Sequence, residues 1–447
     1  MADRAELLAI GDVHLGTRPS RVPVDGSWGV SSEELTPAAA LGLAVDLAVE
    51  RGVDAVLFAG DVVESTNARF EAVPPLENAV RRLVDAGIQV VAVAGNHDVD
   101  ALPRLASLLE GFTLLGAGGK WESYAVTKDG EPLAEIIGWS FGAPRVRESP
   151  VAALLESPLP RLPGAVPRIG LLHADLDASG GPYAPVRQVE LDETGYDAWL
   201  LGHIHKPSID RLATPADRPP SGYLGSLVGL DPSETGPHGP WIVRIGGDGA
   251  VGLERLSIAP LRWEHLQVPV DGFEHPDDVG DALLGEVAEE AVARIRGAGP
   301  LPRALGLRVR LTGASPCQDG IRQTIASGAW NELRRVVDGT AVFYNRIVPA
   351  MRPRLELAEI AGGDDPAALL ARRLILLEES GDASRQLLED ARAALDPTAS
   401  RPVWARAGDH RSDVDPLSDE ALRDTLLRAG MHALEAMLAQ SGERALS

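Results

Sequence analysis

Residues 5–14 read AELLAIGDVH, an apolar run that ends at a glycine followed by Asp12, Val13 and His14. Four further apolar runs also end in polar residues. They are DAVLFA before Gly60-Asp61, IQVVAVA before Gly95-Asn96-His97-Asp98, RIGLL before His173, and DAWLL before Gly202-His203-Ile204-His205. Short apolar strands that alternate with amphipathic helices, here residues 36–51 and 70–86, predict an α/β layer fold. Because loops after the strands of such a sheet line the ligand crevice, these five loops are predicted to converge.

The polar residues at these strand ends have the donor types of a metal site. In Asp12-Val13-His14 and His203-Ile204-His205, residues i and i+2 point to the same side of an extended chain, so each pair can present two ligands to one place. The complete set offers oxygen and imidazole donors and no thiolate: Asp12, His14, Asp61, Asn96, His173, His203 and His205. Such a set suits Mn²⁺, Fe or Zn²⁺ better than Ca²⁺. Asp61 can bridge two cations, and two ions about 3.5–4 Å apart can stabilise both the attacking and the leaving oxygen of a phosphoester displacement.

Each motif by itself has a plainer explanation. A single Asp-x-His, or one histidine at a strand end, is more often a cap or a surface side chain than a metal ligand. Five of the ten histidines, however, fall in the strand-exit motifs. This conjunction favours the metal site.

The composition is that of a globular protein, and the length of 447 residues predicts two or three domains. The single cysteine, Cys317, excludes an intramolecular disulfide and fits a reducing cytosol. No segment resembles a signal peptide or a membrane span, so a cytoplasmic enzyme without a membrane partner is expected. The net charge of −23 argues against a generally basic nucleic-acid binder. Bound cations or a local arginine cluster can nevertheless attract phosphates.

The alternation of strands and helices restarts after a proline-containing turn. The sequence therefore predicts a catalytic domain over residues 1–260, a small α+β capping domain over residues 261–360 and a helical region over residues 361–447. The helical region is expected to hold one helix over residues 366–395 and a linker over residues 396–416 that is rich in proline and charge, followed by a second helix.

The second C-terminal helix is predicted from Pro416 to Leu438. Ser418, Asp419 and Glu420 favour a helix start through capping and the helix dipole. Apolar residues then recur at spacings of three or four: Leu422, Leu426, Ala429, Ala433 and Met437. This stripe is expected to be buried, either against the chain's own cap or against a partner, and the linker favours a mobile arm that docks on a partner.

The motifs GDVHLG, GDVVES, GNHD, HAD and GHIH together resemble those of the calcineurin-like metallophosphoesterases. The resemblance implies a layered α/β/β/α sandwich. It also implies one metal on Asp12, His14 and His205, a second on Asn96, His173 and His203, and Asp61 as the bridge. His97 would contact the phosphate or protonate the leaving oxygen, and Asp98 would orient the His97 imidazole.

The stretch YLGSLVGLDPSETGPHGPWIVRI, residues 223–245, resembles the SbcD and YhaO branch of bacterial DNA-repair exonucleases. This resemblance implies manganese-dependent exonuclease and endonuclease cleavage of DNA. It further implies C-terminal helices that bind an SMC-like ATPase of the SbcC type. The chain departs from many archaeal and eukaryotic relatives at Glu64, where they carry a second histidine, and the role of that histidine cannot be transferred.

Two other functions compete with that of a DNA nuclease. The first is a metallophosphoesterase for a small phosphoester such as a cyclic nucleotide, which would not need a cap and C-terminal helices. The second is a scaffold with an inactive site, which would be expected to have lost ligands, whereas all seven are present. Both features favour the nuclease.

Several other residues allow both a functional and a plain interpretation. Asn67, Arg69 and Phe70 either touch DNA or a second subunit, or simply begin a helix. Arg145 and Arg147 either contact the phosphate backbone or are solvated surface residues. A stripe in the helix that follows favours core packing, to which the family resemblance adds a homodimer contact: Val73, Leu76, Val80, Leu83 and Val84.

Overall fold

The computed structural model describes residues 3–23, 29–64, 71–162, 164, 166–178, 180–209, 219–353, 357–379, 381–399 and 417–445. The chain divides into two compact units. The first comprises residues 1–268, 280–310 and 324–348, and the second comprises residues 269–279, 311–323 and 349–447. The domain limits expected near residues 260 and 360 stay a prediction. Asn67, Arg69 and Phe70 lie outside the described residues.

The first sheet of the first unit has six strands in the order β11-β10-β1-β2-β3-β4. Strands β1 to β4 run parallel, and β10 and β11 add antiparallel strands beside β1. Their bounds are β1 (Asp3–Ile10), β2 (Ala55–Ala59), β3 (Gln89–Val93), β4 (Phe112–Leu114), β10 (Trp241–Gly246) and β11 (Val251–Arg255). Three of the predicted ligand loops leave this sheet, after β1, β2 and β3.

The second sheet has five strands in the order β5-β6-β7-β8-β9. An antiparallel hairpin of β5 and β6 is followed by parallel pairing from β6 to β9. The bounds are β5 (Trp121–Lys128), β6 (Glu131–Trp139), β7 (Arg168–His173), β8 (Ala198–Gly202) and β9 (Ser221–Tyr223). The remaining two ligand loops leave β7 and β8.

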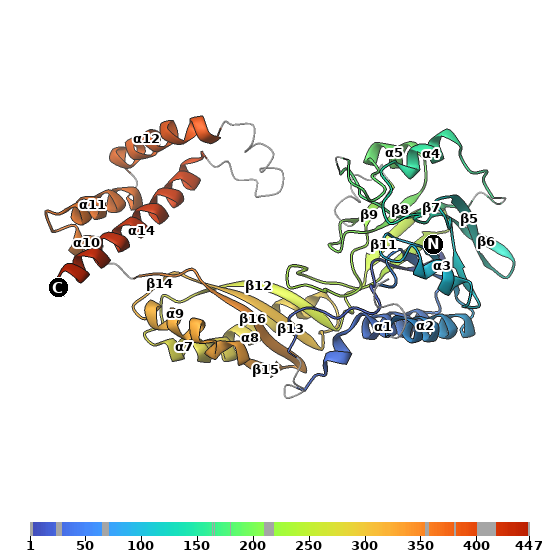
Figure 1. The fold of residues 1–447 in the computed structure, drawn as a ribbon, viewed down its shortest axis with the longest axis horizontal. Helices are drawn as coiled ribbons and strands as arrows, with labels where there is room; N and C mark the ends of the chain where they lie inside the picture. Colours follow the sequence, from blue (N-terminus) through green and yellow to red (C-terminus); the bar gives the residue numbers. More distant parts are fainter. Residues whose placement is uncertain are drawn as a thin grey trace. The chain divides into compact units, whose positions relative to one another are not determined.

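The alternation of side chains along the strands builds four layers. Leu7 and Ala9 of β1 join the core between the two sheets, whereas Leu8 and Ile10 face the helices on the other side. Helices α1 (Pro37–Arg51) and α2 (Val73–Asp85) cover the first sheet, and α4 (Pro150–Glu156) and α5 (Gln188–Glu193) cover the second (Figure 1). The predicted layered α/β/β/α sandwich is confirmed.

Both predicted helices of this unit are present, and α1 begins and ends at recognisable signals. Helix α1 begins after Thr36, whose hydroxyl accepts a hydrogen bond from the Ala39 N–H at 3.3 Å, and it ends at Gly52 with a φ of +63°. In α2 the predicted stripe packs into the core at Leu76, Val80 and Leu83, which are buried. A short helix, α3 (Ala101–Ala106), follows β3.

A four-stranded sheet in the order β12-β13-β16-β15 forms the α+β region expected after residue 260. Its strands are β12 (Leu261–Pro269), β13 (Ala304–Thr312), β15 (Arg334–Val337) and β16 (Thr340–Pro349). The helices of this region are α7 (Pro276–Ala282), which continues through a π-helical segment at Leu283–Val287 into α8 (Ala288–Ile295), and α9 (Gln318–Ser327). Two short strands, β14 (Ala314–Ser315) and β17 (Arg352–Pro353), pair in parallel.

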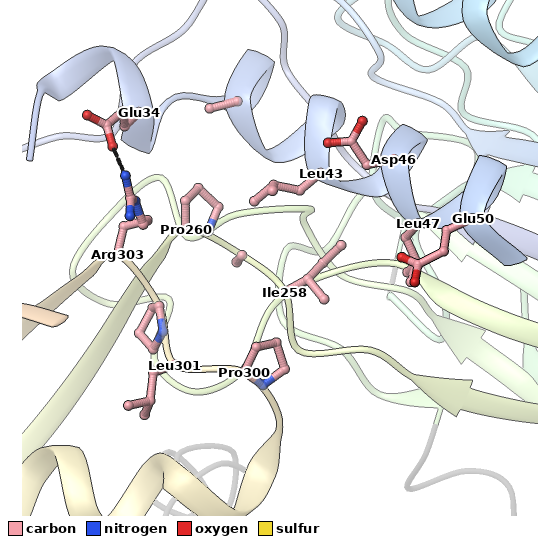
Figure 2. Close-up of a pocket in the computed structure, with 13 residues that line it drawn as sticks. Glu34, Leu43, Asp46, Leu47, Glu50, Ile258, Pro260, Pro300, Leu301 and Arg303 are labelled. Atoms are coloured by element: carbon pink, nitrogen blue, oxygen red, sulfur yellow. Dashed lines mark hydrogen bonds and ion pairs between the residues drawn. The ribbon is translucent and has the colours of Figure 1, made fainter. Parts of the chain in front are cut away.

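A groove of about 610 Å³ lies within the first unit between α1 and the segments 258–260 and 300–303 (Figure 2). Glu34 and Arg303 form an ion pair at 2.7 Å beside it, and both side chains are well exposed to solvent. An exposed pair of this kind contributes little to stability.

The C-terminal helices differ from the prediction in their boundaries. They are α10 (Leu357–Ile360), α11 (Pro366–Glu378), α12 (Asp382–Ala399) and α14 (Asp419–Ala445). The prediction of a single helix over residues 366–395 is wrong. Helix α11 ends at Glu378 and α12 begins at Asp382, and Gly381 lies between them. Helix α12 then continues past the expected start of the linker, and residues 400–416 lie outside the described residues.

Helix α14 packs against α11 and α12 of the same unit. Leu422 and Leu434 are buried there, whereas the predicted stripe residue Met437 is more than one third exposed. Ala429 is also exposed. The stripe was therefore predicted correctly at its start and incorrectly towards its end. Its apolar face is covered by neighbouring C-terminal helices, which is neither of the two burial sites that the sequence suggested.

Candidate metal centre

The strand exits bring the predicted side chains together through sharp turns of the chain. Asp12 and His14 follow β1, Asp61 follows β2, and His173 is the last residue of β7. The backbone at His14, Asp61 and His203 has φ values of +54°, +48° and +106°. Non-glycine residues adopt such values uncommonly, Asp and His more often than most, and strained backbone of this kind is found at functional sites.

Asp12, His14 and His205 form one group of potential ligands. One donor atom from each of these residues lies within 4.8 Å of the others. The Nε2 atoms of His14 and His205 are 3.0 Å apart. Asp12 is buried, and its carboxylate also accepts a hydrogen bond from the His203 N–H at 2.9 Å.

A second group surrounds His173. The His173 Nε2 atom lies 3.3 Å from Asp61 Oδ2 and 3.1 Å from Asn96 Oδ1. Asp61 Oδ2 is also 3.8 Å from His14 Nε2. One carboxylate oxygen thus faces a histidine of each group, which is the position expected of a bridging ligand.

His203 joins the site through a different set of contacts. Its Nε2 atom is 2.9 Å from Asp175 Oδ1, and its ring centroid is 5.1 Å from that of His173. The structure therefore places His203 beside the second group with one ring nitrogen already paired to a carboxylate. The predicted assignment of individual ligands to two ions stays a prediction.

The spacing and chemistry of these donors fit divalent cations. Ligands that bind one ion at about 2.1 Å and at right angles lie about 3 Å apart, close to the distances around His14 and His173. The Nδ1 of His173 lies 3.1 Å from the Ala59 carbonyl oxygen and the Nδ1 of His205 lies 2.8 Å from Glu234 Oε1. Metal-binding histidines usually donate their second N–H to such an oxygen, which leaves Nε2 for the ion.

The electrostatics of the group also favour positive charge. Burial by itself would raise the pKa of the Asp61 carboxyl, but the charge and hydrogen bond of His173 outweigh burial and hold this pKa well below its usual range. Burial would lower the pKa of His173, but Asp61 and Asp12 raise it to about 9. Carboxylates that raise the pKa of a buried histidine also favour a bound cation at the same place. Because metal ligands must be deprotonated, binding of a divalent ion is accompanied by release of protons.

His97 lies at the rim of the site, and its carboxylate partner is not the one that was predicted. The His97 Nδ1 atom is 2.9 Å from Glu64 Oε2, and 46% of the His97 side chain is exposed. Asp98 instead accepts hydrogen bonds from the backbone N–H groups of Val62 and Gly95, each at 2.7 Å. The predicted role of Asp98 in orienting His97 is therefore wrong. Asp98 ties the Asp61 loop to the Asn96 loop, and its burial, together with the charge of Asp61, raises its pKa to about 7.

Three carboxylates that support the histidines were not assigned this role from the sequence. Glu64 contacts His97, Asp175 contacts His203, and Glu234 contacts His205. Burial would raise the pKa of Glu234, but the hydrogen bond from His205 lowers it. Asp175 lies within the HAD motif and could have been found there, whereas the partners of the other two depend on the folded loops.

Arg145 and Arg147 are exposed, as their plainer interpretation predicts. Val146, which lies between them, forms a parallel bridge with Tyr183. The Val146 N–H donates to the Pro182 oxygen, and the Ala184 N–H donates to the Val146 oxygen, both at 2.8 Å. The Tyr183 ring centroid lies 5.1 Å from that of His203. The arginine loop is thus attached to a segment that contacts the site.

Comparison with known families agrees with this geometry. Residues 5–207 match the family described as calcineurin-like phosphoesterase. Residues 5–207 are a calcineurin-like phosphoesterase domain. Phosphoesterases of this family are generally hydrolytic and use a dinuclear divalent metal site, for which the described residues supply candidate ligand groups. Residues 263–352 match a second family, described as the middle domain of metallophosphoesterase YhaO.

The curated relatives are similar to this chain at modest identity. The uncharacterized metallophosphoesterase YhaO of Bacillus subtilis is 28% identical over 291 residues, which are 61% of this chain and 63% of that protein. The DNA double-strand break repair protein Mre11 of Aeropyrum pernix is 27% identical over 274 residues, 59% of this chain and 64% of that protein. The matches thus span less than two thirds of either relative.

Two further observations concern distant likeness and membranes. Among solved structures, a dimetal phosphatase from Danio rerio covers 55% of this chain and 94% of its own, at 12% identity and a TM-score of 0.34. None of the helices in the described part of the chain has the length and apolar character needed to span a membrane.

Proposed function

We propose that this chain is the nuclease subunit of a DNA-repair enzyme and hydrolyses phosphodiester bonds of DNA as an exonuclease and endonuclease. The observation that carries the proposal is the exposed His97 ring beside converging ligands that face one another across about 3 Å. An acid group at an exposed rim can reach the backbone of a large substrate. Similarity to a protein named for double-strand break repair supports DNA as that substrate.

The residues of the site are assigned two roles, the binding of cations and the transfer of a proton. Asp12, His14 and His205 would hold one ion, Asn96, His173 and His203 the other, and Asp61 would contact both. Bound divalent cations supply positive charge that stabilises the phosphate and lowers the pKa of an attacking water. His97 donates a proton from Nε2 to the leaving oxygen, because its Nδ1 faces Glu64.

Manganese is the proposed metal. The oxygen and imidazole donors of the site, with no thiolate among them, suit Mn²⁺ as well as Fe and Zn²⁺. Activity measured after removal of metal and addition of one ion at a time is expected to be highest with Mn²⁺. Full activity with Mg²⁺ alone would refute this choice.

An SMC-like ATPase of the SbcC type is the proposed partner of the C-terminal helices. Leu369 and Leu376 lie seven residues apart on α11, and the side chains of both are more than one third exposed. Leu369→Ser should weaken co-purification with such an ATPase and leave metal content unchanged. Leu108→Ser, at an exposed leucine of the first unit, is the matched control.

A homodimer is proposed from the family resemblance alone, since Leu76, Val80 and Leu83 of α2 are occupied in the core. Light scattering gives the mass directly. A monomer at every concentration and in the presence of DNA would exclude the dimer.

The alternative substrate is a small phosphoester such as a cyclic nucleotide. The Bacillus relative is named only as a metallophosphoesterase, which does not specify a substrate. The domain at residues 263–352 and the C-terminal helices favour a macromolecule, because a small-molecule hydrolase does not need them.

A direct comparison of substrates tests the proposed function. The full-length protein with Mn²⁺ is given linear double-stranded DNA, single-stranded DNA and a cyclic nucleotide, and Asn96→Ala serves as the inactive control. Release of nucleotides from DNA that is abolished by the control substitution and by a chelator is expected. Turnover of the cyclic nucleotide without any DNA cleavage would replace the proposal by its alternative.

A further inference from the structure

Glu64 is held next to the His14 loop by its backbone. The Glu64 N–H donates to the Leu15 carbonyl oxygen at 2.9 Å, and the Leu15 N–H donates to the Val62 carbonyl oxygen at the same distance. Leu15 and Val63 form a parallel bridge, and both are fully buried. The backbone of Glu64 is therefore fixed relative to the loop that carries His14.

The Glu64 carboxylate lies between two imidazole rings. Its Oε2 atom is 2.9 Å from His97 Nδ1 and 3.5 Å from His14 Nδ1. The two ring centroids are 5.1 Å apart and the rings are nearly perpendicular, at 84°. Only 15% of the Glu64 side chain is exposed, compared with 46% of the His97 side chain.

A carboxylate in this position determines which ring nitrogen carries a hydrogen. An ionised carboxylate accepts hydrogen bonds and cannot donate them. The Nδ1 atom that faces Glu64 therefore carries the hydrogen, and the Nε2 atom of the same ring is directed away from Glu64. In His14 the same arrangement leaves Nε2 to face His205 Nε2 at 3.0 Å.

Two other assignments are less consistent with the contacts. Asp98 is fully buried and its two oxygens face the Val62 and Gly95 backbones, whereas the carboxylate that contacts the partly exposed His97 ring is that of Glu64. His14, Glu64 and His97 also lie close enough to hold a cation of their own. Such an ion would need both Nδ1 atoms without hydrogen and would take the place of the hydrogen bond to His97.

We infer that Glu64 is a positioning residue for proton transfer, which holds the His97 imidazole with Nε2 directed at the leaving oxygen and joins that ring to the His14 loop. This inference rests on the proposed role of His97 in the hydrolysis. As the water oxygen forms its bond to phosphorus, the bond from phosphorus to the leaving oxygen breaks, and that oxygen takes the proton from His97 Nε2. The attacking water releases a proton to solvent, and His97 is reprotonated from solvent.

A pair of leaving groups separates this role from a purely structural one. The substrates are the p-nitrophenyl and phenyl esters of thymidine 5′-phosphate, because p-nitrophenolate leaves without protonation and phenolate gains from it. The proteins compared are the full-length wild type, Glu64→Ala, Glu64→Gln, His97→Ala and the double variant Glu64→Ala/His97→Ala. Glu77→Gln, at an exposed carboxylate on α2, is the matched control. Metal content is counted by mass spectrometry for every protein.

The expected result is a loss that depends on the leaving group. Glu64→Ala should lower turnover of the phenyl ester about 10–100-fold, with a clearly smaller loss on the p-nitrophenyl ester. Glu64→Gln keeps an acceptor oxygen and should lose less, and the double variant should lose no more than His97→Ala. Metal content should stay the same in all variants.

Equal losses on both esters would overturn the inference, as would loss of metal ions in Glu64→Ala or a third ion that only the wild type retains. The DNA assay is independent of this test. A protein that cleaves the esters but not DNA would refute the proposed substrate, while the ratio between the esters would still report on Glu64.

Discussion

In the loops that carry the candidate metal ligands, backbone turns position the side chains, whereas in the C-terminal helices packing positions the buried leucines. His14, Asp61 and His203 occupy strained positive-φ turns that fix where each ligand points. Helix α14 is regular, and its buried residues depend on which face meets α11. A shift of the sequence by one residue in a loop would move the candidate ligands out of the site. The same shift in a helix rotates the buried face by about 100°, so that another leucine can take the buried position.

The first prediction tests chemistry at the site without disturbing its frame. His97→Ala should lower hydrolysis about 10²–10⁴-fold, the usual effect of losing a general acid, while both metal ions are retained. Turnover of DNA and metal content are measured on the same preparation. Unchanged turnover would remove His97 from the mechanism.

The second prediction concerns packing in the C-terminal helices. Leu422 is fully buried among leucines of α11 and α12, so Leu422→Ala should lower the stability of this region by about 2–5 kcal/mol. Hydrogen exchange of α11 and α14 reports that loss. Metal content should not change, and a loss of bound metal would show that the two regions are energetically linked.

The third and fourth predictions make the same substitution in both regions. An added Cβ at Gly95 would lie 2.1 Å from Asp61 Oδ1, an atom that also accepts a hydrogen bond from the His97 N–H. Because that carboxylate cannot move without losing its place in the site, Gly95→Ala should weaken metal binding about 10–100-fold, comparable to loss of an outer partner. Titration calorimetry measures this affinity, and a wild-type value would show that the loop can accommodate the added methyl group.

At Gly430 the added Cβ would meet the flexible end of Leu374 at 2.5 Å. Gly430→Ala should therefore change stability by no more than about 1 kcal/mol, because the gain in helix propensity offsets the crowding. A shift in the melting temperature of α14 that corresponds to several kcal/mol would show that the packed face is as rigid as the loops.

The contrast also explains which features the sequence predicts. Asp12, Asp61 and His173 are recognisable because a metal site needs particular donor atoms directly after particular strands. The pairing of His97 with Glu64 rather than with the adjacent Asp98 depends on how the β2 and β3 loops meet, which a linear motif does not contain. Along α14 several leucines satisfy the helical spacing, so periodicity cannot select Leu434 over Met437 before the position of α11 is known.

The measurement that tests the account most directly is the metal content of Asp61→Ala. Asp61 Oδ2 faces His14 of one group and His173 of the other, and the charge of Asp61 is the largest contribution that raises the pKa of His173. Native mass spectrometry of the wild type after loading with Mn²⁺ should show two ions per chain, and Asp61→Ala should lose both together. Two ions retained by Asp61→Ala would contradict the shared site.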